Sequence, residues 1–295
     1  MINLSFSCAK SLLIATLCLA LLGCSTNSAN GISSPQSAEA SNQNEQNQNM
    51  PGLNVLLFSK TEGFRHNSIE PAIELLQTTA AEREWNLTST EDGALFTESN
   101  LANFDVVVFL LTSGDVLNVE QQAAFEQFIQ GGGGYAGIHS ASDTEYDWPW
   151  YGGLVGAYFN GHPAIQTAEL NTSNEPHAST SFLPTPWTLN DEWYNFRSNP
   201  AANNDIKVLL WLDESTYSGG NMGAEHPITW YQLYDGGRAW YTGIGHRSEH
   251  YTGEEGDLFQ QHIIAGIEWA ADRSNVPVDP SILTEKIYLP LSVSN

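Results

Sequence analysis

Residues 131–143 combine a glycine run, a short apolar segment and a histidine. This pattern can place the histidine side chain at the end of a strand, where it could take part in catalysis or binding. The segment reads Gly-Gly-Gly-Gly-Tyr-Ala-Gly-Ile-His-Ser-Ala-Ser-Asp. It predicts a strand over Tyr135–Ile138, then a tight turn and a helix start. Such a turn lifts its central residue above the sheet edge, as in a nucleophile elbow. That residue is His139 instead of Ser or Cys, which favours proton transfer, metal ligation or ligand binding over acyl-enzyme chemistry.

Several histidines occupy predicted loops of the chain. They are His66, His139, His162, His226 and His246. His66, His139 and His246 each follow a predicted strand, and the carboxyl ends of parallel strands meet at one edge of a sheet. Imidazole suits acid/base catalysis near neutral pH, and three imidazoles with a carboxylate also suit a zinc-type site. The chain has no short-range metal motif such as His-Glu-x-x-His, and hydrogen bonding to loop backbone is the alternative role.

Two acidic residues and one arginine accompany these histidines. Glu192 lies next to the aromatic residues Trp193 and Tyr194, which predicts a raised pKa and a role as acid or base; an ordinary loop acid is the alternative. Asp143, four residues after His139, would orient an imidazole or bind sugar hydroxyls; its alternative role is a first-turn acid favoured by the helix dipole. Arg65 would clamp an anionic or hydroxylated ligand, or pair with a nearby acid.

Aromatic residues are dense between residues 145 and 200 and in the loops that follow. Aromatic faces pack on the apolar faces of sugar rings, so we expect Trp193 and Tyr194, with His162 and His226, to bind substrate. A small satellite core under long loops is the alternative. Either way, residues 145–200 are predicted to form a long irregular insertion, and such insertions usually carry function.

The remaining chain predicts the elements that position these residues. Strands alternate with helices, which is typical of a parallel sheet with helices on both faces. The predicted strands are Leu53–Phe58, Asp105–Leu111, Gly134–Ile138, Ile206–Leu212, Ile228–Leu233 and Arg238–Thr242. The predicted helices are Ser68–Trp85, with Ser68 as N-cap, Val119–Gln130 and Asp257–Ala271.

The N-terminus looks like an export signal. Residues 1–23 carry Lys10 and an apolar run that is too short for a stable membrane span. Leu21-Leu22-Gly23-Cys24 looks like a bacterial lipobox, which implies cleavage before Cys24 and lipid on its thiol; a soluble secretory signal is the alternative. Residues 24–52 are predicted to be a flexible tether, and residues 274–295 a C-terminal tail. We therefore expect a protein of the bacterial cell envelope, held to the membrane by lipid alone and facing the periplasm or the exterior.

Cysteine content and charge exclude several functions. Cys8 and Cys18 would leave with the leader and Cys24 would carry lipid, so the mature chain would have no cysteine nucleophile and no thiolate metal site. The formal net charge is −24. Such a surface repels nucleic-acid phosphate and anionic lipid, so we expect no nucleic-acid partner. The oligomeric state is left open.

A set of six motifs in order resembles the trehalose-utilisation (ThuA-like) family over residues 53–272. The motifs are Gly63-Phe64-Arg65-His66, residues 137–143, Gly156-Ala157-Tyr158-Phe159 with Gly161-His162-Pro163, Asp191-Glu192-Trp193-Tyr194, His226-Pro227-Ile228-Thr229-Trp230, and residues 237–242 with Gly245-His246. The resemblance implies a flavodoxin-like, mostly parallel sheet similar to class I glutamine amidotransferases, in a ThuA-like domain over residues 53–273. It also implies metabolism of sugars or oxidised (keto) sugars. The amidotransferase cysteine is absent, so that activity does not carry over.

These observations lead to one main hypothesis and two alternatives. The main hypothesis is a lipoprotein enzyme that performs acid/base chemistry on a sugar or keto-sugar. His66 and His139 would act as acid, base or ligand, assisted by Glu192 and His246. The alternatives are a non-catalytic carbohydrate-binding lipoprotein and a metal-dependent hydrolase. The sequence implies no specific cofactor, and a divalent metal is the one candidate.

Overall fold

The computed structural model describes residues 52–253 and 256–272. The predicted leader, Cys24, the tether up to residue 51 and the tail from residue 274 lie outside the described residues. Within the described ranges, no helix combines the length and the apolar character needed to cross a membrane.

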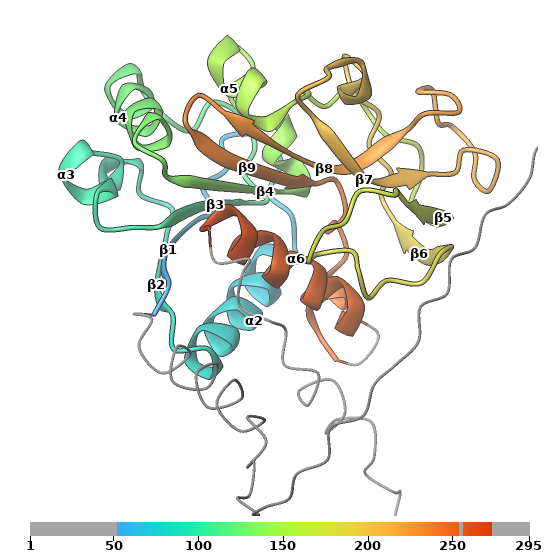
Figure 1. Cartoon of the computed structure of the whole chain (residues 1–295), viewed down its shortest axis with the longest axis horizontal. Coiled ribbons are helices and arrows are strands. Elements are labelled where there is room, and N and C mark those ends of the chain that lie inside the picture. Colours follow the sequence, from blue (N-terminus) through green and yellow to red (C-terminus); the bar gives the residue numbers. More distant parts are fainter. Residues whose placement is uncertain (1–51, 254–255, 273–295) are drawn as a thin grey trace, which may run out of the picture. The chain divides into compact units, whose positions relative to one another are not determined.

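A mixed sheet forms the centre of the described chain, in the strand order β2-β1-β3-β4-β9-β8-β7-β5-β6 (Figure 1). The first five strands in this order are parallel to one another. The last four continue the sheet with antiparallel pairings. The predicted α/β fold with a flavodoxin-like sheet is thus confirmed. The strands are β1 Asn54–Phe58, β2 Asn86–Thr90, β3 Val106–Leu110, β4 Gly134–Ile138, β5 Gln166–Thr172, β6 Trp187–Asp191, β7 Lys207–Leu212, β8 Pro227–Tyr234 and β9 Gly237–Thr242.

Strand register aligns the carboxyl ends of the parallel strands at one edge. Leu110 of β3 pairs with Ile138 of β4, and Ile138 pairs with Thr242 of β9. The next residues along the chain, His139 and Gly243, therefore start side by side. The run of β3, Val-Val-Val-Phe-Leu, is buried throughout, as expected for a strand covered on both faces. The register thus delivers loop residues from distant parts of the sequence to a shared edge.

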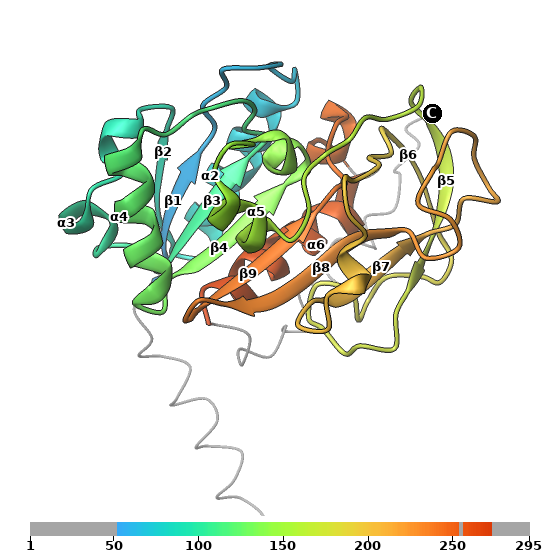
Figure 2. The ribbon, with the colours of Figure 1, turned by 90° about the horizontal axis from the view of Figure 1, so that it is seen from above.

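Helices cover both faces of the sheet (Figures 1 and 2). Helices α4 (Val119–Gln130) and α5 (Pro149–Val155) lie over one face, and α2 (Ile69–Glu82) and α6 (Asp257–Ala270) lie over the other. The short α3 (Glu98–Leu101) contacts α4. Glycine permits a close approach between β4 and the end of α6, because a Cβ on Gly134 would lie 2.3 Å from the carbonyl oxygen of Ala270.

Helix α4 has the predicted bounds, and its start follows from its sequence. Asn118 and Gln121 form a capping box, in which each side chain accepts a hydrogen bond from the other residue's backbone N–H. Helix α2 departs from prediction at its cap. Ser68 occupies the N-cap position without capping the helix, and its hydroxyl instead donates to the carbonyl oxygen of Gly245 at 3.3 Å. Ser68 thereby ties α2 to the loop after β9.

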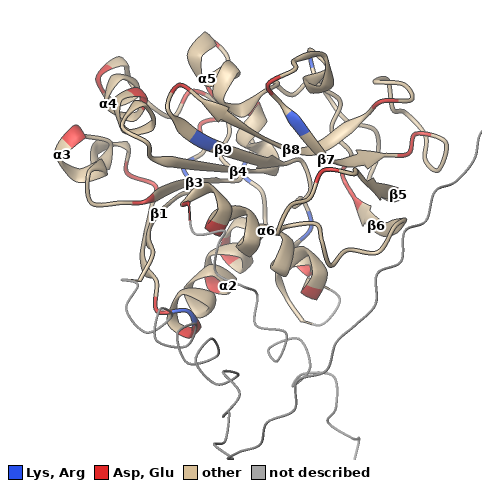
Figure 3. Cartoon of the chain, viewed as in Figure 1, with Lys and Arg blue, Asp and Glu red and all other residues tan. Residues whose placement is uncertain are grey.

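Two parts of the sequence prediction were wrong. Residues 145–200 are not a long irregular insertion, because they contain α5 and the strands β5 and β6 that extend the sheet. Strand β2 was missed because it is a mostly exposed edge strand with a polar sequence, Asn-Leu-Thr-Ser-Thr, and so lacks the apolar pattern of a buried strand. In the ribbon of Figure 3, positions of Asp and Glu are spread over helices on both faces of the sheet, whereas positions of Lys and Arg are sparse.

Candidate functional site

Four side chains from separate segments converge at the carboxyl edge of the sheet. They are His66 after β1, His139 after β4, Glu192 after β6 and His246 after β9, and we call them the histidine–glutamate cluster. One nitrogen or carboxylate oxygen of each lies within 4.8 Å of the corresponding atom of every other member. The structure thus brings together the four residues that the sequence singled out for catalysis.

His139 is the most constrained member of the cluster. Its backbone has φ +51°, a left-handed conformation that is uncommon for a residue with a Cβ and that concentrates at functional sites. Its side chain is fully buried, and Nδ1 lies 2.8 Å from the carbonyl oxygen of Gly243. Because a carbonyl only accepts hydrogen bonds, Nδ1 carries a proton, and in the neutral tautomer with this contact Nε2 holds the lone pair. Nε2 faces Glu192 Oε2 at 3.5 Å.

Glu192 is surrounded by imidazoles on both of its carboxylate oxygens. Oε2 lies 3.5 Å from His139 Nε2 and 3.2 Å from His246 Nδ1, and Oε1 lies 3.1 Å from His162 Nδ1. Burial opposes ionisation of this carboxyl, but the imidazoles of His139 and His246 outweigh burial and lower its pKa. The raised pKa expected from the flanking aromatic residues was therefore wrong, because the neighbours through space are histidines.

His66 and His246 complete the cluster with edge-to-face ring contacts. The His66 ring centroid lies 4.8 Å from that of His139 and 5.1 Å from that of His246. Burial, followed by the nearby imidazoles, lowers the pKa of His66 to about 3. For His246, the Glu192 carboxylate outweighs burial and raises the pKa. The exposed ring of Phe64 packs 4.8 Å from His66 and marks the outer side of the cluster.

Asp191 and His250 lie beside the cluster and contact each other. The sequence analysis identified neither of them as a site residue. Asp191 is fully buried, accepts a hydrogen bond from Gly245 N at 2.7 Å and lies 3.5 Å from His250 Nε2. Gly245 has φ +134°, and a Cβ there would meet the Tyr251 hydroxyl at 2.5 Å, so glycine is required just before His246. Asp191 directly precedes Glu192 in the sequence, and this position was the one feature from which its role near the cluster could have been predicted.

The other polar candidates lie around the cluster instead of within it. His162 is at the rim, with its side chain 40% exposed and Nδ1 near both Glu192 Oε1 and the Pro163 carbonyl oxygen. Arg65 forms ion pairs with Glu70 and Glu91 at 2.6 and 2.8 Å. Its guanidinium is therefore engaged outside the cluster. These ion pairs match the alternative role predicted for Arg65.

Asp143 is partly buried, and its pKa is raised by burial. It accepts a hydrogen bond from the Tyr146 hydroxyl at 2.5 Å. The cluster does not include it. Asp143 therefore stabilises the loop after His139, while the imidazole contacts of the site are made by Glu192.

The structure places the side chains of Trp193, Tyr194 and His226, which the sequence predicted to bind substrate, in the protein interior. Trp193 is fully buried and donates to the Gln166 carbonyl oxygen at 2.8 Å. The Tyr194 ring packs against His139 with a centroid distance of 4.2 Å. His226 is fully buried, with Nε2 2.8 Å from the Tyr194 carbonyl oxygen and Nδ1 2.8 Å from Glu214. These residues therefore form the small satellite core that the sequence analysis gave as the alternative. The Tyr194 ring of this core packs directly against His139 of the cluster.

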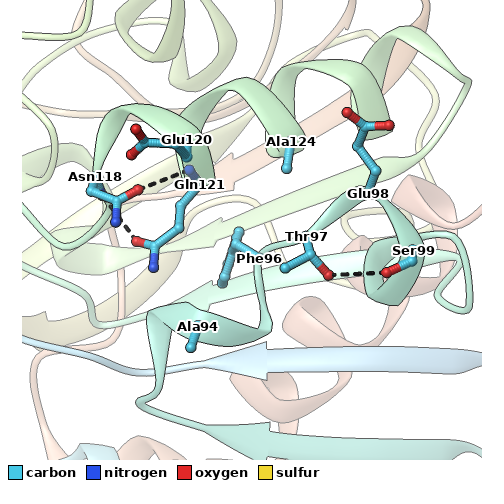
Figure 4. Close-up of a pocket in the computed structure, with 9 residues that line it drawn as sticks. All are labelled: Ala94, Phe96, Thr97, Glu98, Ser99, Asn118, Glu120, Gln121 and Ala124. Atoms are coloured by element: carbon cyan, nitrogen blue, oxygen red, sulfur yellow. Dashed lines mark hydrogen bonds between the residues drawn. The ribbon is translucent and has the colours of Figure 1, made fainter.

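A surface hollow lies away from the cluster, between α4 and the segment containing α3 (Figure 4). Its polar side chains largely satisfy local backbone groups: Asn118 and Gln121 cap α4, and Thr97 accepts from Asn100 N. None of the four cluster residues lines it. Its lining residues are Ala94, Phe96, Thr97, Glu98, Ser99, Asn118, Glu120, Gln121 and Ala124.

Comparison with known proteins agrees with this fold. The family model ThuA, described as trehalose utilisation, matches residues 54–270. A solved ThuA-like protein from Bacteroides uniformis is 22% identical with a TM-score of 0.63, covering 75% of this chain and 91% of that one. A ThuA-like protein from Parabacteroides merdae is 20% identical with a TM-score of 0.59, covering 75% and 90%. Both likenesses concern the fold. No curated protein matches the sequence.

Proposed function

This chain belongs to the ThuA family, described as trehalose utilisation, and from this premise and the site geometry we propose that it is an enzyme acting on carbohydrates at the histidine–glutamate cluster. The family description supports a carbohydrate-related function. One observation carries the enzymatic part of the proposal: Glu192 holds an imidazole at each carboxylate oxygen, His246 at Oε2 and His162 at Oε1. Oriented imidazoles beside a carboxylate are groups that transfer protons.

The proposed reaction moves a proton at a carbon next to the carbonyl of a sugar or keto-sugar. His162 is suited to this step because its Nδ1 faces two oxygen acceptors, Glu192 Oε1 and the Pro163 carbonyl, at 3.1 and 2.8 Å. The Nδ1 proton is thus engaged, and in the neutral tautomer with this contact Nε2 offers the lone pair of a base. The exposure of His162 at the rim gives a substrate access to it.

Phe64 supports a carbohydrate as the substrate class. Its side chain is 64% exposed and its ring lies beside His66. An exposed aromatic face next to polar groups suits a pyranose ring, whose C–H face is apolar and whose hydroxyls are polar. Trp193 and Tyr194, in contrast, are too deeply buried to supply this contact.

Deuterium exchange tests the proposal even when the product has not been identified. The protein is incubated in D₂O with disaccharides and their keto derivatives, and NMR follows deuterium uptake at carbons next to the carbonyl. We expect uptake in the wild type and a fall of about 10²–10⁴-fold in Glu192→Gln and His162→Ala, the usual contribution of general acid–base groups.

Glu70→Gln, the same substitution at an exposed carboxylate on α2, provides the control and should exchange like the wild type. Equal exchange in Glu192→Gln and the wild type would refute the proposal. Sugar binding by calorimetry with neither exchange nor turnover would also refute it, and would favour a carbohydrate-binding protein.

We propose in addition that the chain is exported and anchored through lipid on Cys24. The support is the lipobox-like Leu21-Leu22-Gly23-Cys24 after a short apolar run. Cys24→Ser is expected to move the protein from the membrane fraction to the soluble fraction and to abolish labelling by radioactive fatty acid. Unchanged membrane association and labelling in that variant would rule out this anchor.

A further inference from the structure

We infer that the histidine–glutamate cluster binds one divalent first-row transition-metal cation, with Zn²⁺ as the probe, through His66, His139, Glu192 and His246. The inference rests on the proposed function, because it concerns the same site. It adds the metal ion that the four side chains would bind next to the substrate.

Interatomic distances within the cluster match those between ligands of a metal ion. Ligand nitrogens and oxygens of a tetrahedral Zn²⁺ site, bound at about 2.0–2.1 Å, are separated from one another by about 3.3 Å. Glu192 Oε2 lies 3.5 Å from His139 Nε2 and 3.2 Å from His246 Nδ1. These separations exceed the usual N–H···O distance of about 2.9–3.0 Å. The four ligand atoms lie within 4.8 Å of one another, and a contraction of the longest separations to about 3.3 Å would place all four around one ion.

Two buried ring nitrogens of the cluster lack hydrogen-bond partners. Neither His139 Nε2 nor His246 Nδ1 has such a partner among the residues that the structure describes, although both lie near Glu192. Because the Nδ1 proton of His139 is directed at Gly243 O, its Nε2 presents a lone pair to a carboxylate. A cation bound at this position would be shared between His139 Nε2 and the Glu192 carboxylate. An imidazole whose other nitrogen donates to a backbone carbonyl is also the usual arrangement of a metal-bound histidine.

Buried negative charge around the cluster supports a cation as the occupant. Glu192 and Asp191 are consecutive and both are buried. Asp191 Oδ1 has no hydrogen-bond partner within the described ranges. A buried carboxylate without full compensation is costly. A divalent ion bound by Glu192 would offset this charge at the point where three imidazoles already converge.

The donor set decides the kind of metal. Three imidazole nitrogens and one carboxylate suit Zn²⁺ and related first-row ions, whereas Mg²⁺ and Ca²⁺ require mostly oxygen ligands. When bound, the ion would supply Lewis-acid polarisation of a sugar oxygen. His162, held on the opposite carboxylate oxygen, is left as the proton-transferring group. Metal binding and proton transfer are therefore assigned to different histidines.

The test measures metal binding in the absence of any sugar. The full chain is purified without an affinity tag, stripped with chelator and titrated with Zn²⁺, Mg²⁺ and Ca²⁺ by calorimetry; Co²⁺ absorption then reports the ligands. We expect one tight Zn²⁺ site with no comparable Mg²⁺ or Ca²⁺ binding. Co²⁺ should show visible ligand-field bands without the near-ultraviolet bands of thiolate, which separates the cluster from the cysteines of the leader.

Matched variants locate the site. Glu192→Gln and the partly exposed His246→Ala should weaken Zn²⁺ binding by at least about 100-fold, because each removes a ligand. Glu214→Gln, at a carboxylate paired with His226 outside the cluster, should bind Zn²⁺ like the wild type, as should His162→Ala. Retained affinity in Glu192→Gln and His246→Ala, or absence of a stoichiometric site in the wild type, would overturn the inference.

Deuterium exchange by the stripped protein separates this inference from the proposed function. If the wild type catalyses exchange but binds no Zn²⁺, the proposed function is supported and the inferred metal site is refuted. If the wild type binds Zn²⁺ stoichiometrically but catalyses no exchange on any sugar, with or without the ion, the metal site is supported and the proposed reaction is refuted.

Discussion

Replacement of His262 by glutamine tests how the free energy of unfolding of this protein depends on pH. His262 lies on α6 and is fully buried, with Nδ1 2.7 Å from the Ser179 carbonyl oxygen and Nε2 3.3 Å from Thr242 Oγ1. The ring packs 5.0 Å from that of Trp240. Burial lowers the pKa of His262 to about 4 from an ordinary value of 6.5. The folded protein therefore keeps this imidazole neutral at pH values where the unfolded chain protonates it.

The size of the effect follows from linkage between protonation and folding. Because the folded pKa is the lower one, the stability associated with neutral His262 is fully present above pH 6.5. It is lost as pH falls from 6.5 toward 4. With these two pKa values, the unfolded state gains about 2 kcal/mol relative to the folded state at pH 5. Other groups also titrate in this window, so the effect is isolated by a variant.

His262→Gln removes the titration while its amide can still donate to Ser179 O and accept from the Thr242 hydroxyl. Urea unfolding at pH 8 and pH 5 gives the free energy of unfolding for both proteins. Between these pH values we expect the wild type to lose about 2 kcal/mol more than the variant. Gln261→Ala, on the same helix, serves as control and should follow the wild type. An equal loss in His262→Gln and the wild type would refute the reasoning.

Three further predictions concern residues around the site. Trp193→Ala should lower the free energy of unfolding by about 3–5 kcal/mol, since Trp193 is a buried core residue; an unchanged urea midpoint would contradict its core role. Burial raises the pKa of Glu145 to about 7, so its stabilising contribution is full below the unfolded value of 4.5 and is lost as pH rises through 7. Glu145→Gln should therefore gain stability over the wild type on going from pH 5 to pH 8, and parallel urea curves would show otherwise. Asp191→Asn should weaken Zn²⁺ binding by about 10–100-fold, because Asp191 positions the loop that carries His246; undiminished affinity by calorimetry would exclude that positioning role.

Local sequence patterns predicted the strands whose side chains are almost all buried. The apolar runs of β1 and β3 and the glycine run before β4 were sufficient, because buried strands must be apolar on both faces. The same reasoning failed for β2, β5 and β6. These strands are edge or near-edge strands with mixed polar sequences, and their pairing depends on partners far away in the chain. Local patterns alone therefore indicate an irregular segment at residues 145–200.

For the site, sequence spacing predicted which histidines lie near a strand end but not which of them face one another. His66, His139 and His246 were expected at one edge, and all three are in the cluster. His226 was expected at the site as well, yet both of its nitrogens are engaged in the interior. The sequence cannot distinguish the two cases, because each histidine simply follows or precedes an apolar segment.

The sequence by itself determined the residue types available for chemistry: imidazoles and carboxylates in a domain without cysteine, and a histidine raised on the turn after a buried strand. Only the tertiary structure decided their partners and their charge. Glu192 was expected to be a carboxyl with a raised pKa, and its pKa is lowered instead because the fold brings the imidazoles of His139 and His246 to one of its oxygens. Burial and charge act through space at a few ångströms, and those distances arise from strand pairings between residues far apart in the chain.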